Sequence, residues 1–373
     1  MINKNVTIGI NLQYGCKTGN WRFQENFIQA LNPNNWNDNL DLHGFTFGYR
    51  YQRDDSFPNF LKYHKTFIPG RIQLALSCKF KVPVEAIFRL PKLDLIIDFG
   101  MTSFKSNSKV CMYVPDVAWR EYKNGEYETT FSKRSSSRTE EGIRKADYIF
   151  TISDYSKNQI RKWFPDIRSD IFNIPLGSSF KAMDMVSGNV IKKRLKISKK
   201  RFFLYVGAIN ARKNIEILGR AMDILGDDFL LVHAGPEPAE GLAFWGLDKK
   251  NILSLGYVSD SCLHYLYKEC FAIIFPSKIE GFGLPLVEGM FYRKPIICSN
   301  IPIFKEIGQD CPIYFDPNDP NDLAIKMRYL AGNSNIIDGL AEKGSFISGK
   351  YTWENTRGKV IEMLQNILAK QPN

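Results

Sequence analysis

The sequence predicts an α/β protein with two doubly wound, Rossmann-like domains, each built on a largely parallel sheet. Short apolar segments alternate with helix-length segments along the whole chain, as in βαβ units. The 373 residues exceed the size at which a single core usually stops growing, about 250–300 residues. Both halves also begin alike, with an apolar strand, a glycine-containing loop and a helix.

The first half alternates strand and helix patterns. Strands are expected at residues 6–12, 42–47, 93–98, 110–114, 148–152 and 171–174. Helices are expected between them, notably at residues 21–31, 138–145 and 154–163. Ser153 precedes the last of these helices and is a favoured N-cap residue. The stretch 177–200 contains Gly, Ser and Lys without a strand pattern, and is expected to link the halves.

The second half repeats the alternation. Strands are expected at residues 202–207, 229–234, 251–255, 272–275 and 296–298, with a helix near residues 214–225. Ligands of doubly wound sheets bind beyond the carboxyl ends of the strands. Two such domains facing each other would therefore form one binding cleft.

Composition excludes several classes of protein. Hydrophobic residues make up 44% and charged residues 24%, which excludes wholesale disorder. No apolar run approaches the roughly 20 residues of a membrane-spanning helix, and the N-terminus lacks a signal-peptide pattern. The 7 cysteines and 4 histidines are scattered without metal-ligand spacing. Reduced thiols in a cytoplasmic protein, and no bound metal, are therefore expected.

The net charge of +11 predicts an anionic partner. Residues 50–92 hold nine basic and three acidic side chains, interleaved with aromatic and aliphatic ones. Such a surface suits peripheral contact with an anionic membrane. A merely solvated basic face would have the same composition.

The most informative stretch is residues 275–290, where an apolar strand runs into a glycine-rich loop. Pro285 is placed to be the first residue of the next helix, so the N–H groups of residues 281–284 would be free to hold an anion or sugar hydroxyls. Glu280 and Glu288 flank this loop, and a carboxylate can accept hydrogen bonds from two hydroxyls. A plain turn, whose acids only match the helix dipole, is the alternative.

A second motif lies at residues 205–214. The strand ends at Gly207, and Arg212 and Lys213 are expected at the start of the following helix. Two cations there oppose the helix dipole unless an anion shares the site. A diphosphate would serve, with Arg212 binding it through two hydrogen bonds. Two exposed surface cations are the alternative.

Together these motifs resemble the retaining GT-B glycosyltransferases of the family-four, or group 1, type. Glu280 and Glu288 are separated by seven residues, as in that family, and Arg212, Lys213 and Asn214 match its basic run. Further matches are residues 146–153, 174–177, 256–260 and 351–353. The resemblance is dense in the second half of the chain and looser in the first.

The resemblance implies the GT-B fold, with two facing Rossmann-like domains and an interdomain cleft. Residues 1–180 would form the acceptor domain, residues 181–345 the nucleotide-sugar donor domain, and residues 346–373 a helix that crosses back to the first domain. The implied reaction moves a hexosyl unit from a nucleoside diphosphate sugar to a glycan or lipid-linked glycan, with retention of configuration. No cofactor is implied, and no metal is expected.

The same resemblance implies a role for each site residue. Arg212 and Lys213 would neutralise the departing diphosphate, and Glu280 would position the transferred sugar; these three are the expected catalytic residues. Glu288 would hold the ribose, and Val258 would lie against the base. The full expected donor site consists of Gly19, Gly207, Val258, Gly281, Phe282, Gly283, Leu284 and Glu288.

The first domain departs from the family in two places. Gly19 belongs to a stretch similar to the family's glycine loop, but Asn20 or Trp21 replaces the usual second glycine. Pro115 stands where many relatives carry His, which leaves Asp116 as the expected acceptor-site residue. An ordinary turn residue at a strand end is the alternative for Asp116.

Two other functions remain open. A nucleotide-sugar epimerase on the same fold would act without an acceptor. A basic nucleic-acid-binding protein would explain the charge, but no RNA- or DNA-type motif is present and no nucleic acid partner is expected. A Rossmann dehydrogenase ranks last because neither half has Gly-x-Gly-x-x-Gly after a strand. The resemblance, together with the basic first half, implies bacterial surface-polysaccharide synthesis, such as that of lipopolysaccharide, in the cytoplasm or at the inner face of the membrane.

Overall fold

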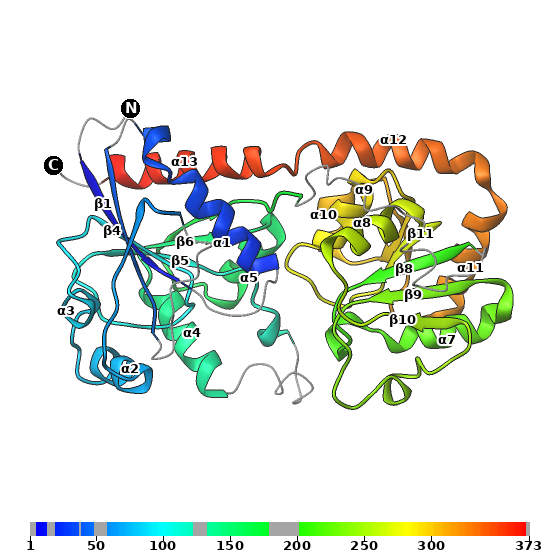
Figure 1. The fold of residues 1–373 in the computed structure, drawn as a ribbon, viewed down its shortest axis with the longest axis horizontal. Coiled ribbons are helices and arrows are strands. Elements are labelled where there is room, and N and C mark those ends of the chain that lie inside the picture. Colours follow the sequence, from blue (N-terminus) through cyan, green and yellow to red (C-terminus); the bar gives the residue numbers. More distant parts are fainter. Residues whose placement is uncertain are drawn as a thin grey trace. The chain divides into compact units, whose positions relative to one another are not determined.

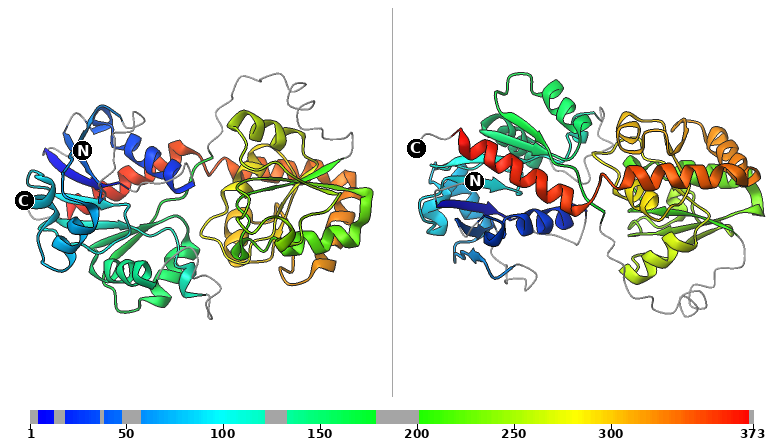
Figure 2. Two further views of the ribbon diagram at one scale, coloured as in Figure 1. Left: turned by 60° about the horizontal axis from the view of Figure 1, so that its bottom comes forward. Right: turned by 90° about the horizontal axis from the view of Figure 1, so that it is seen from above.

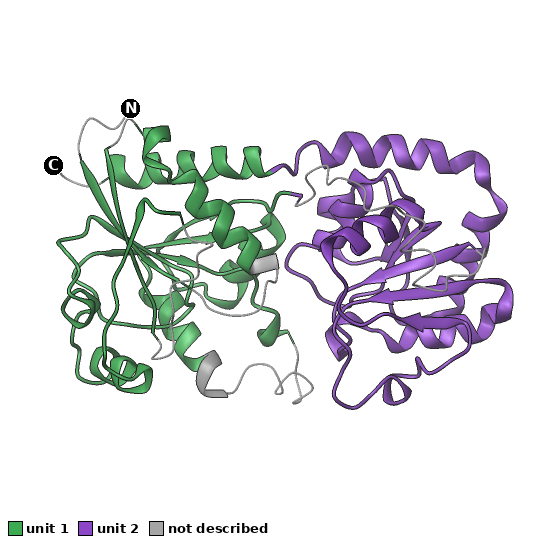
Figure 3. Ribbon diagram, in the orientation of Figure 1, with its two compact units in different colours: residues 1–177, 353–373 green, residues 178–352 purple. Residues whose placement is uncertain are grey.

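The computed structural model describes residues 5–12, 19–36, 39–47, 58–121, 133–178 and 201–370. The chain forms two compact units (Figure 3). Unit 1 consists of residues 1–177 and 353–373, and unit 2 of residues 178–352. The expected linker at 177–200 lies, beyond residue 178, outside the described residues.

Unit 1 contains a seven-stranded sheet in which every described pairing is parallel. The strands are, in spatial order, β3 (Leu61–Tyr63), β2 (Leu40–Phe45), β1 (Val6–Asn11), β4 (Leu95–Asp98), β5 (Lys109–Tyr113), β6 (Tyr148–Thr151) and β7 (Asp170–Asn173). The chain order reverses between β1 and β4, which makes this the switch point of a doubly wound sheet.

Helices flank this sheet (Figure 1). They are α1 (Gly19–Ala30), α2 (Gly70–Cys78), α3 (Val84–Phe88), α4 (Lys133–Lys145), α5 (Asp154–Trp163) and α13 (Trp353–Ala369). The expected cap of α5 is confirmed, because the Ser153 hydroxyl accepts a hydrogen bond of 3.0 Å from the N–H of Ser156. Phe23 and Phe27 of α1 pack on Phe99 and Phe150 in the core.

Unit 2 contains a six-stranded sheet, again with only parallel pairings among the described strands. Its spatial order is β10 (Ile252–Ser254), β9 (Leu230–Ala234), β8 (Phe202–Val206), β11 (Ala272–Phe275), β12 (Ile296–Ser299) and β13 (Ile313–Phe315). Its α-helices are α7 (Glu216–Leu225), α8 (Asp260–Glu269), α9 (Leu284–Phe291), α10 (Pro302–Gly308), α11 (Pro320–Gly332) and α12 (Ile337–Ser348). The switch point falls between β8 and β11.

The helix α13 belongs to unit 1, although it follows unit 2 in sequence (Figure 2). It packs against α1 and buries Val360, Met363, Leu364 and Ile367 at helical spacing. Thr356 donates a hydrogen bond of 2.7 Å to the carbonyl oxygen of Pro175. These contacts fasten the end of the chain to the first core.

Two features of the fold differ from the expectations. The strands β3 and β13 were not expected, since each has only three residues and too short an apolar pattern. The helix expected from residue 214 begins at Glu216, because Ala211–Lys213 forms a 3₁₀ turn and Asn214 adopts a left-handed φ of 54°. No helix in the described part of the chain combines the length and apolar character that a membrane crossing requires.

Candidate functional site

Two loops meet at the switch point of unit 2. One follows β8 and the other follows β11, and because these strands pair in parallel, both loops leave the same edge of the sheet. The N–H of Lys278 donates to the carbonyl oxygen of Arg212 at 3.0 Å. The Arg212 guanidinium in turn donates to the carbonyl oxygen of Ile279 at 3.3 Å. One main-chain and one side-chain hydrogen bond thus join the two motifs that the sequence predicts to be functional.

The three expected catalytic residues form one cluster at this junction. Arg212 Nη1 lies 2.7 Å from Glu280 Oε2, and the Lys213 ammonium pairs with Glu280 Oε1. The exposed fractions of the side chains are 26% for Arg212, 12% for Lys213 and 8% for Glu280. Ser277 also donates to Glu280 Oε1, at 2.9 Å. The carboxylate is therefore nearly buried, whereas the guanidinium still reaches the surface.

The charges of the cluster do not cancel. Burial alone would raise the pKa of Glu280, but Arg212 and Lys213 outweigh burial and lower it to about 2. Glu280 is therefore ionised at neutral pH, and one negative charge faces two positive ones. Among these three side chains, the positive charge exceeds the negative charge by one. Lys213 Nζ also lies 5.0 Å from the centroid of the Phe275 ring, a cation–π contact that fixes its position.

Two asparagines shape the loop that carries the cations. The Asn210 side chain accepts a hydrogen bond of 3.1 Å from the N–H of Lys213. Asn214 donates from Nδ2 to the carbonyl oxygens of Pro276 and Pro317, at 3.1 and 2.7 Å. No role was predicted for Asn210 or Ser277 from the sequence. The sequence could have indicated both, because short polar side chains often bond to neighbouring residues. Asn210 stands two residues before Arg212, and Ser277 stands three residues before Glu280.

The two cations do not lie at the start of a helix, so they do not oppose a helix dipole in the way expected. Arg212 and Lys213 lie in the 3₁₀ turn before α7, and Glu216 occupies the first turn of that helix. The anion that shares the site in this structure is Glu280 of the same chain. The motif thus contains its own counter-charge.

The glycine-rich loop leads into α9. Gly283 is the N-cap with a φ of 100°, and a Cβ there would lie 3.0 Å from Phe304 Cε1, so the loop requires glycine at this position. Pro285 is the second residue of α9, not the first as expected, because Leu284 already has helical geometry. Among the described residues, none accepts a hydrogen bond from the N–H of Phe282, Gly283 or Leu284. Three donors at a helix start are thus available to a ligand.

The side chains around this loop are mostly part of the core. Phe282 is buried and packs edge-on against Tyr351, with centroids 5.5 Å apart, so only its main chain can contact a donor. Gly281 and Gly283 are buried, and Leu284 is partly exposed. The loop therefore offers a ligand its backbone rather than its side chains.

Glu288 is held by an aromatic pair. It is 3% exposed, and the Tyr267 hydroxyl donates to its Oε2 at 2.6 Å. The Tyr267 ring stacks on Tyr292 with an interplanar angle of 4°. Neither tyrosine was predicted from the sequence, because they come from two different helix regions without a shared motif. The ribose role of Glu288 stays a prediction.

Gly207, at the end of β8, is fixed by its neighbours in β9. It has a φ of 146°. Its N–H donates to the carbonyl oxygen of Ala234 at 3.0 Å, and its carbonyl oxygen accepts from His233 Nε2 at 2.8 Å. The carbonyl requires His233 to carry its proton on Nε2. Val258 is partly exposed between β10 and α8. Its role beside the base stays a prediction.

The expected site residues Gly19 and Asp116 belong to unit 1, whereas the cluster belongs to unit 2. Gly19 is the first residue of α1, while residues 13–18 of the expected glycine loop lie outside the described residues. Asp116 Oδ1 accepts from the N–H of Ala118 at 3.0 Å, which is the turn geometry considered as the alternative. The acceptor role of Asp116 stays a prediction.

A buried carboxyl group, which was not predicted from the sequence, lies at the switch point of unit 1. Asp98, at the end of β4, is 1% exposed and accepts from Asn11 Nδ2 at 2.6 Å and from the N–H of Gly100 at 2.9 Å. Burial raises its pKa to about 7, because these hydrogen bonds only partly offset the loss of water.

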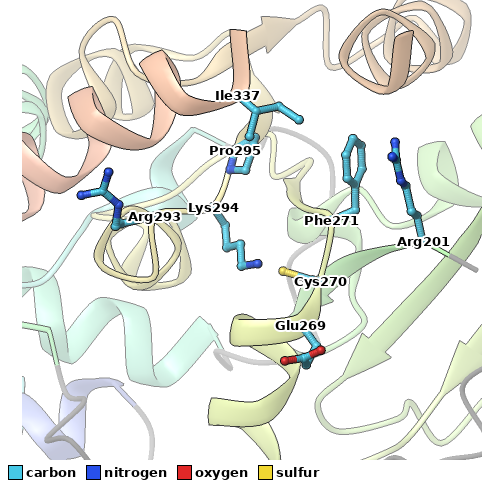
Figure 4. Close-up of a pocket in the computed structure, with 8 residues that line it drawn as sticks. All are labelled: Arg201, Glu269, Cys270, Phe271, Arg293, Lys294, Pro295 and Ile337. Carbon is cyan, nitrogen blue, oxygen red and sulfur yellow. The ribbon is translucent and has the colours of Figure 1, made fainter. Parts of the chain in front are cut away.

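A pocket of about 320 Å³ lies at the opposite edge of the unit 2 sheet (Figure 4). Arg201, Phe271 and Pro295, which line it, immediately precede β8, β11 and β12. In Figure 4, Lys294 points toward Cys270, whereas Arg293 points away. The pocket is thus distinct from the cluster, which follows the carboxyl ends of the strands. Across the described ranges, no group of three or more His, Cys, Asp or Glu side chains could hold a metal ion.

Comparison with known proteins agrees with this geometry. Residues 188–344 match the family model of the Glycosyl transferases group 1. The chain is 27% identical over 232 residues to an O-antigen chain mannosyltransferase B of Escherichia coli. It is 25% identical over 233 residues to the O-antigen chain mannosyltransferase RfbU of Salmonella typhimurium. These matches cover 59% and 61% of this chain, and they span 61% of each relative's length.

Solved structures share the fold over nearly the whole chain. A sucrose-phosphate synthase from Thermosynechococcus elongatus has a TM-score of 0.73 at 17% identity, with 98% of this chain and 100% of that chain covered. Anabaena Alr3699/HepE, in complex with UDP and glucose, has a TM-score of 0.70 at 13% identity, with 97% and 100% covered.

The fold and the switch-point cluster define a two-unit α/β protein of the GT-B type. The chain carries a glycosyl transferase group 1 domain at residues 188–344, within unit 2. The prediction of two parallel-sheet α/β domains of the GT-B type is therefore confirmed, and so is the resemblance to the glycosyl transferases group 1 over residues 188–344.

Proposed function

We propose that this protein is a retaining glycosyltransferase of O-antigen or lipopolysaccharide synthesis. It would move a hexosyl unit from a nucleoside diphosphate sugar to a glycan or lipid-linked glycan. The observation that carries the proposal is the nearly buried cluster of Arg212, Lys213 and Glu280, with its net positive charge, at the switch point of unit 2. Doubly wound sheets bind nucleotides at such points.

The names of the relatives favour mannose as the transferred hexose, because both are mannosyltransferases. A fold relative, Anabaena Alr3699/HepE, has been solved with UDP-glucose, a donor of the proposed chemical class. The base of the nucleotide is left to experiment, since a few pocket contacts decide it.

In the proposed mechanism, the chain stabilises charge on the departing diphosphate. Negative charge grows on the phosphate oxygens as the glycosidic bond breaks, and Arg212 and Lys213 are already in place to receive it. The N–H groups of the loop before α9 would hold the sugar or the phosphate. The leaving oxygen can itself accept the proton of the acceptor hydroxyl on the same face, so we assign no nucleophile or base.

The main role of Glu280 in this mechanism is to orient both cations, because each of its oxygens already has a cationic partner. We also propose that the transfer needs no metal, since two side-chain cations can neutralise the departing diphosphate. Unchanged turnover in excess EDTA is the expected result, and a loss that Mg²⁺ or Mn²⁺ restores would overturn this part of the proposal.

Ligand-induced stabilisation tests the donor site directly. The thermal unfolding of the protein is followed with UDP, GDP, dTDP and CDP sugars, and with NAD for comparison. At 100 times the dissociation constant, a donor should stabilise the protein by about 2.7 kcal/mol. We expect a response to one nucleotide class, and its loss in Arg212→Ala and Glu288→Ala.

Arg212→Ala should also lower turnover about 100-fold, as the loss of one preorganised donor to a developing charge does. Arg220→Ala is the matched control, because this side chain of α7 is 70% exposed and lies outside the cluster. Turnover of Arg212→Ala close to that of Arg220→Ala would rule out the donor assignment.

The two alternatives give different results in the same assays. Conversion of the sugar nucleotide without an acceptor would indicate an epimerase. Retention on DNA that salt abolishes, without any nucleotide response, would indicate a nucleic-acid-binding protein.

A further inference from the structure

The pocket of about 320 Å³ in unit 2 lies where the strands begin, away from the switch-point cluster (Figure 4). Arg201 and Phe271, which line it, immediately precede β8 and β11, whereas Arg212 and Glu280 follow the same two strands. Its volume reaches the lower end of the range of small-molecule sites, about 300–1,000 Å³. The proposed transfer reaction does not use this pocket.

Three apolar side chains line the pocket, namely Phe271, Pro295 and Ile337. The N–H of Phe271 donates to the carbonyl oxygen of Phe202 at 2.8 Å, and its ring packs edge-on against Phe203 with centroids 5.6 Å apart. Pro295 is buried, and its carbonyl oxygen accepts from the N–H of Ile273 at 3.0 Å. The sheet therefore holds much of the apolar lining in place, and a ligand can pack its carbon skeleton on it.

The cations of the pocket have no counter-ion in the part of the chain that the structure describes. Arg201, Arg293 and Lys294 line the pocket, and none of them forms an ion pair or a side-chain hydrogen bond with a described residue. Arg201 Cζ lies 5.2 Å from the centroid of the Phe271 ring, a cation–π contact that holds the guanidinium beside the apolar lining. In Figure 4, Lys294 points toward Cys270, which also lines the pocket, and Arg293 points away. Arg201 and Lys294 are therefore the two cations suited to an anionic ligand.

The other polar side chains of the lining are Glu269 and Cys270. Burial raises the pKa of the Cys270 thiol to about 12, so it stays neutral, and it donates to the carbonyl oxygen of Tyr267 at 3.3 Å. Glu269 is exposed and forms no ion pair or side-chain hydrogen bond with any residue that the structure describes. Its carboxylate can accept a hydrogen bond from a ligand hydroxyl, and it repels a second negative group on a ligand.

We propose that this pocket binds a hexose monophosphate. Arg201 would hold the phosphate through two hydrogen bonds, and Lys294 would add a point charge. The sugar ring would pack on Phe271 and the other apolar side chains, and one of its hydroxyls would donate to Glu269. The same carboxylate would disfavour a ligand with a second phosphate.

The pocket is independent of the proposed donor site. The two lie at opposite ends of β8 and β11, so each can be changed without touching the other. Arg212→Ala, which should lose the nucleotide response, should bind the hexose monophosphate like the natural protein. A failure of the pocket proposal would in turn leave the nucleotide response intact.

Isothermal titration calorimetry of the full chain tests the proposal. The ligands are glucose 6-phosphate, mannose 6-phosphate, glucose, inorganic phosphate and glucose 1,6-bisphosphate. We expect at least one of the two monophosphates to bind about 10-fold more tightly than inorganic phosphate and the bisphosphate, and glucose not to bind, because only a monophosphate satisfies the cations without opposing Glu269. Absence of binding by both monophosphates, or tighter binding of the bisphosphate, overturns the proposal.

A matched pair of double variants locates the site. R201Q/K294Q should weaken monophosphate binding by about 10-fold or more, because it removes both phosphate-binding cations. R293Q/K250Q removes the same charge from unit 2 and should bind as the natural protein does. Its changes fall on a lining side chain that points away from Cys270 and on a lysine that is 80% exposed. Equal loss in the two double variants, or loss of monophosphate binding in Arg212→Ala, would contradict the assignment to this pocket.

Glu269→Gln tests the selectivity separately. Removing the negative charge should let glucose 1,6-bisphosphate bind at least as tightly as glucose 6-phosphate, because the repulsion of the second phosphate is gone. The thermal unfolding of each variant shows whether its fold is retained. An unchanged preference for the monophosphate in Glu269→Gln would refute the role of this carboxylate and, with it, the proposed ligand class.

Discussion

The single carboxylate of Glu280 pairs with both cations of the cluster. Its two oxygens accept hydrogen bonds from Arg212, Lys213 and Ser277. A carboxylate offers roughly four acceptor positions, so little capacity remains for sugar hydroxyls. Glu280 is therefore better suited to fixing the two cations than to binding the sugar.

Glu280→Gln should make the stability of the protein less dependent on acid. The pKa of Glu280 is lowered from 4.5 to about 2, so its ionised form stabilises the fold fully above pH 4.5, and this stability is lost as the pH falls toward 2. We expect the variant to be about 3 kcal/mol less stable at pH 7, with the difference shrinking below pH 4.5. Urea unfolding at pH 7, 4 and 3 measures it. Glu216→Gln, on an exposed side chain, should show no such trend, and a pH-independent difference in Glu280→Gln would refute the prediction.

Asp98→Asn should have the opposite effect and raise the stability of the protein above neutral pH. The pKa of Asp98 is raised from 3.8 to about 7, so the stability that its neutral form contributes is complete below pH 3.8 and is lost as the pH rises to 7. An amide stays neutral and keeps an oxygen for Asn11. We expect the variant to gain up to about 4 kcal/mol over the natural protein at pH 8, and little at pH 4. Urea unfolding at both pH values decides, and a lower stability of the variant at pH 8 would contradict the buried-charge explanation.

The residues of the cluster could be predicted because their motifs are local in sequence. Arg212 and Lys213 are adjacent, and Glu280 stands beside the glycines that reveal the loop. Asp98 and Tyr267 could not be predicted in this way. Asp98 bonds to Asn11, 87 residues away, and Tyr267 bonds to Glu288, 21 residues away in another helix. Burial of a polar side chain is a property of the tertiary fold, which a single sequence does not display.

At the scale of elements, the loops after β8 and β9 depend on a close approach of two main chains. A Cβ on Gly235 would lie 2.1 Å from the carbonyl oxygen of Gly207. That carbonyl also accepts the hydrogen bond from His233. Glycine at 235 thus allows β9 to hold the end of β8, and with it the start of the loop that carries Arg212.

Gly235→Ala should therefore disturb the site as well as the fold. We expect a loss of about 2–3 kcal/mol in the free energy of unfolding, because the backbone must move to admit the methyl group. Nucleotide binding should weaken with it. Gly339→Ala is the control, since nothing lies within 4 Å of a Cβ there and α12 favours alanine. Chemical unfolding and nucleotide titration measure both effects, and equal behaviour of the two variants would contradict the argument.

The elements that could be predicted are those whose pattern is continuous and buried on both faces. All residues of β4, β6, β11 and β12 are buried, and their apolar runs were visible in the sequence. The edge strand β3 has one buried residue in three, which gives no usable pattern. The start of α7 was misplaced because the left-handed Asn214, which separates the 3₁₀ turn from the helix, is fixed by Pro276 and Pro317 far along the chain.

At the scale of the whole molecule, the chain builds two separate cores. Unit 2 is inserted between the main part of unit 1 and its last helix. Each unit has its own parallel sheet and its own buried side chains. Units of this size with separate cores generally unfold as distinct cooperative transitions.

Calorimetry of the full chain should therefore show two transitions that respond to different changes. Leu364 of α13 and Leu330 of α11 are both 0% exposed, one in unit 1 and the other in unit 2. Leu364→Ala should lower one transition and Leu330→Ala the other, each by the equivalent of about 2–5 kcal/mol. The donor nucleotide should raise only the transition that Leu330→Ala lowers, because Arg212, Lys213 and Glu280 belong to unit 2. A nucleotide that raises the transition sensitive to Leu364→Ala instead would place the donor site in unit 1 and contradict the assignment made here.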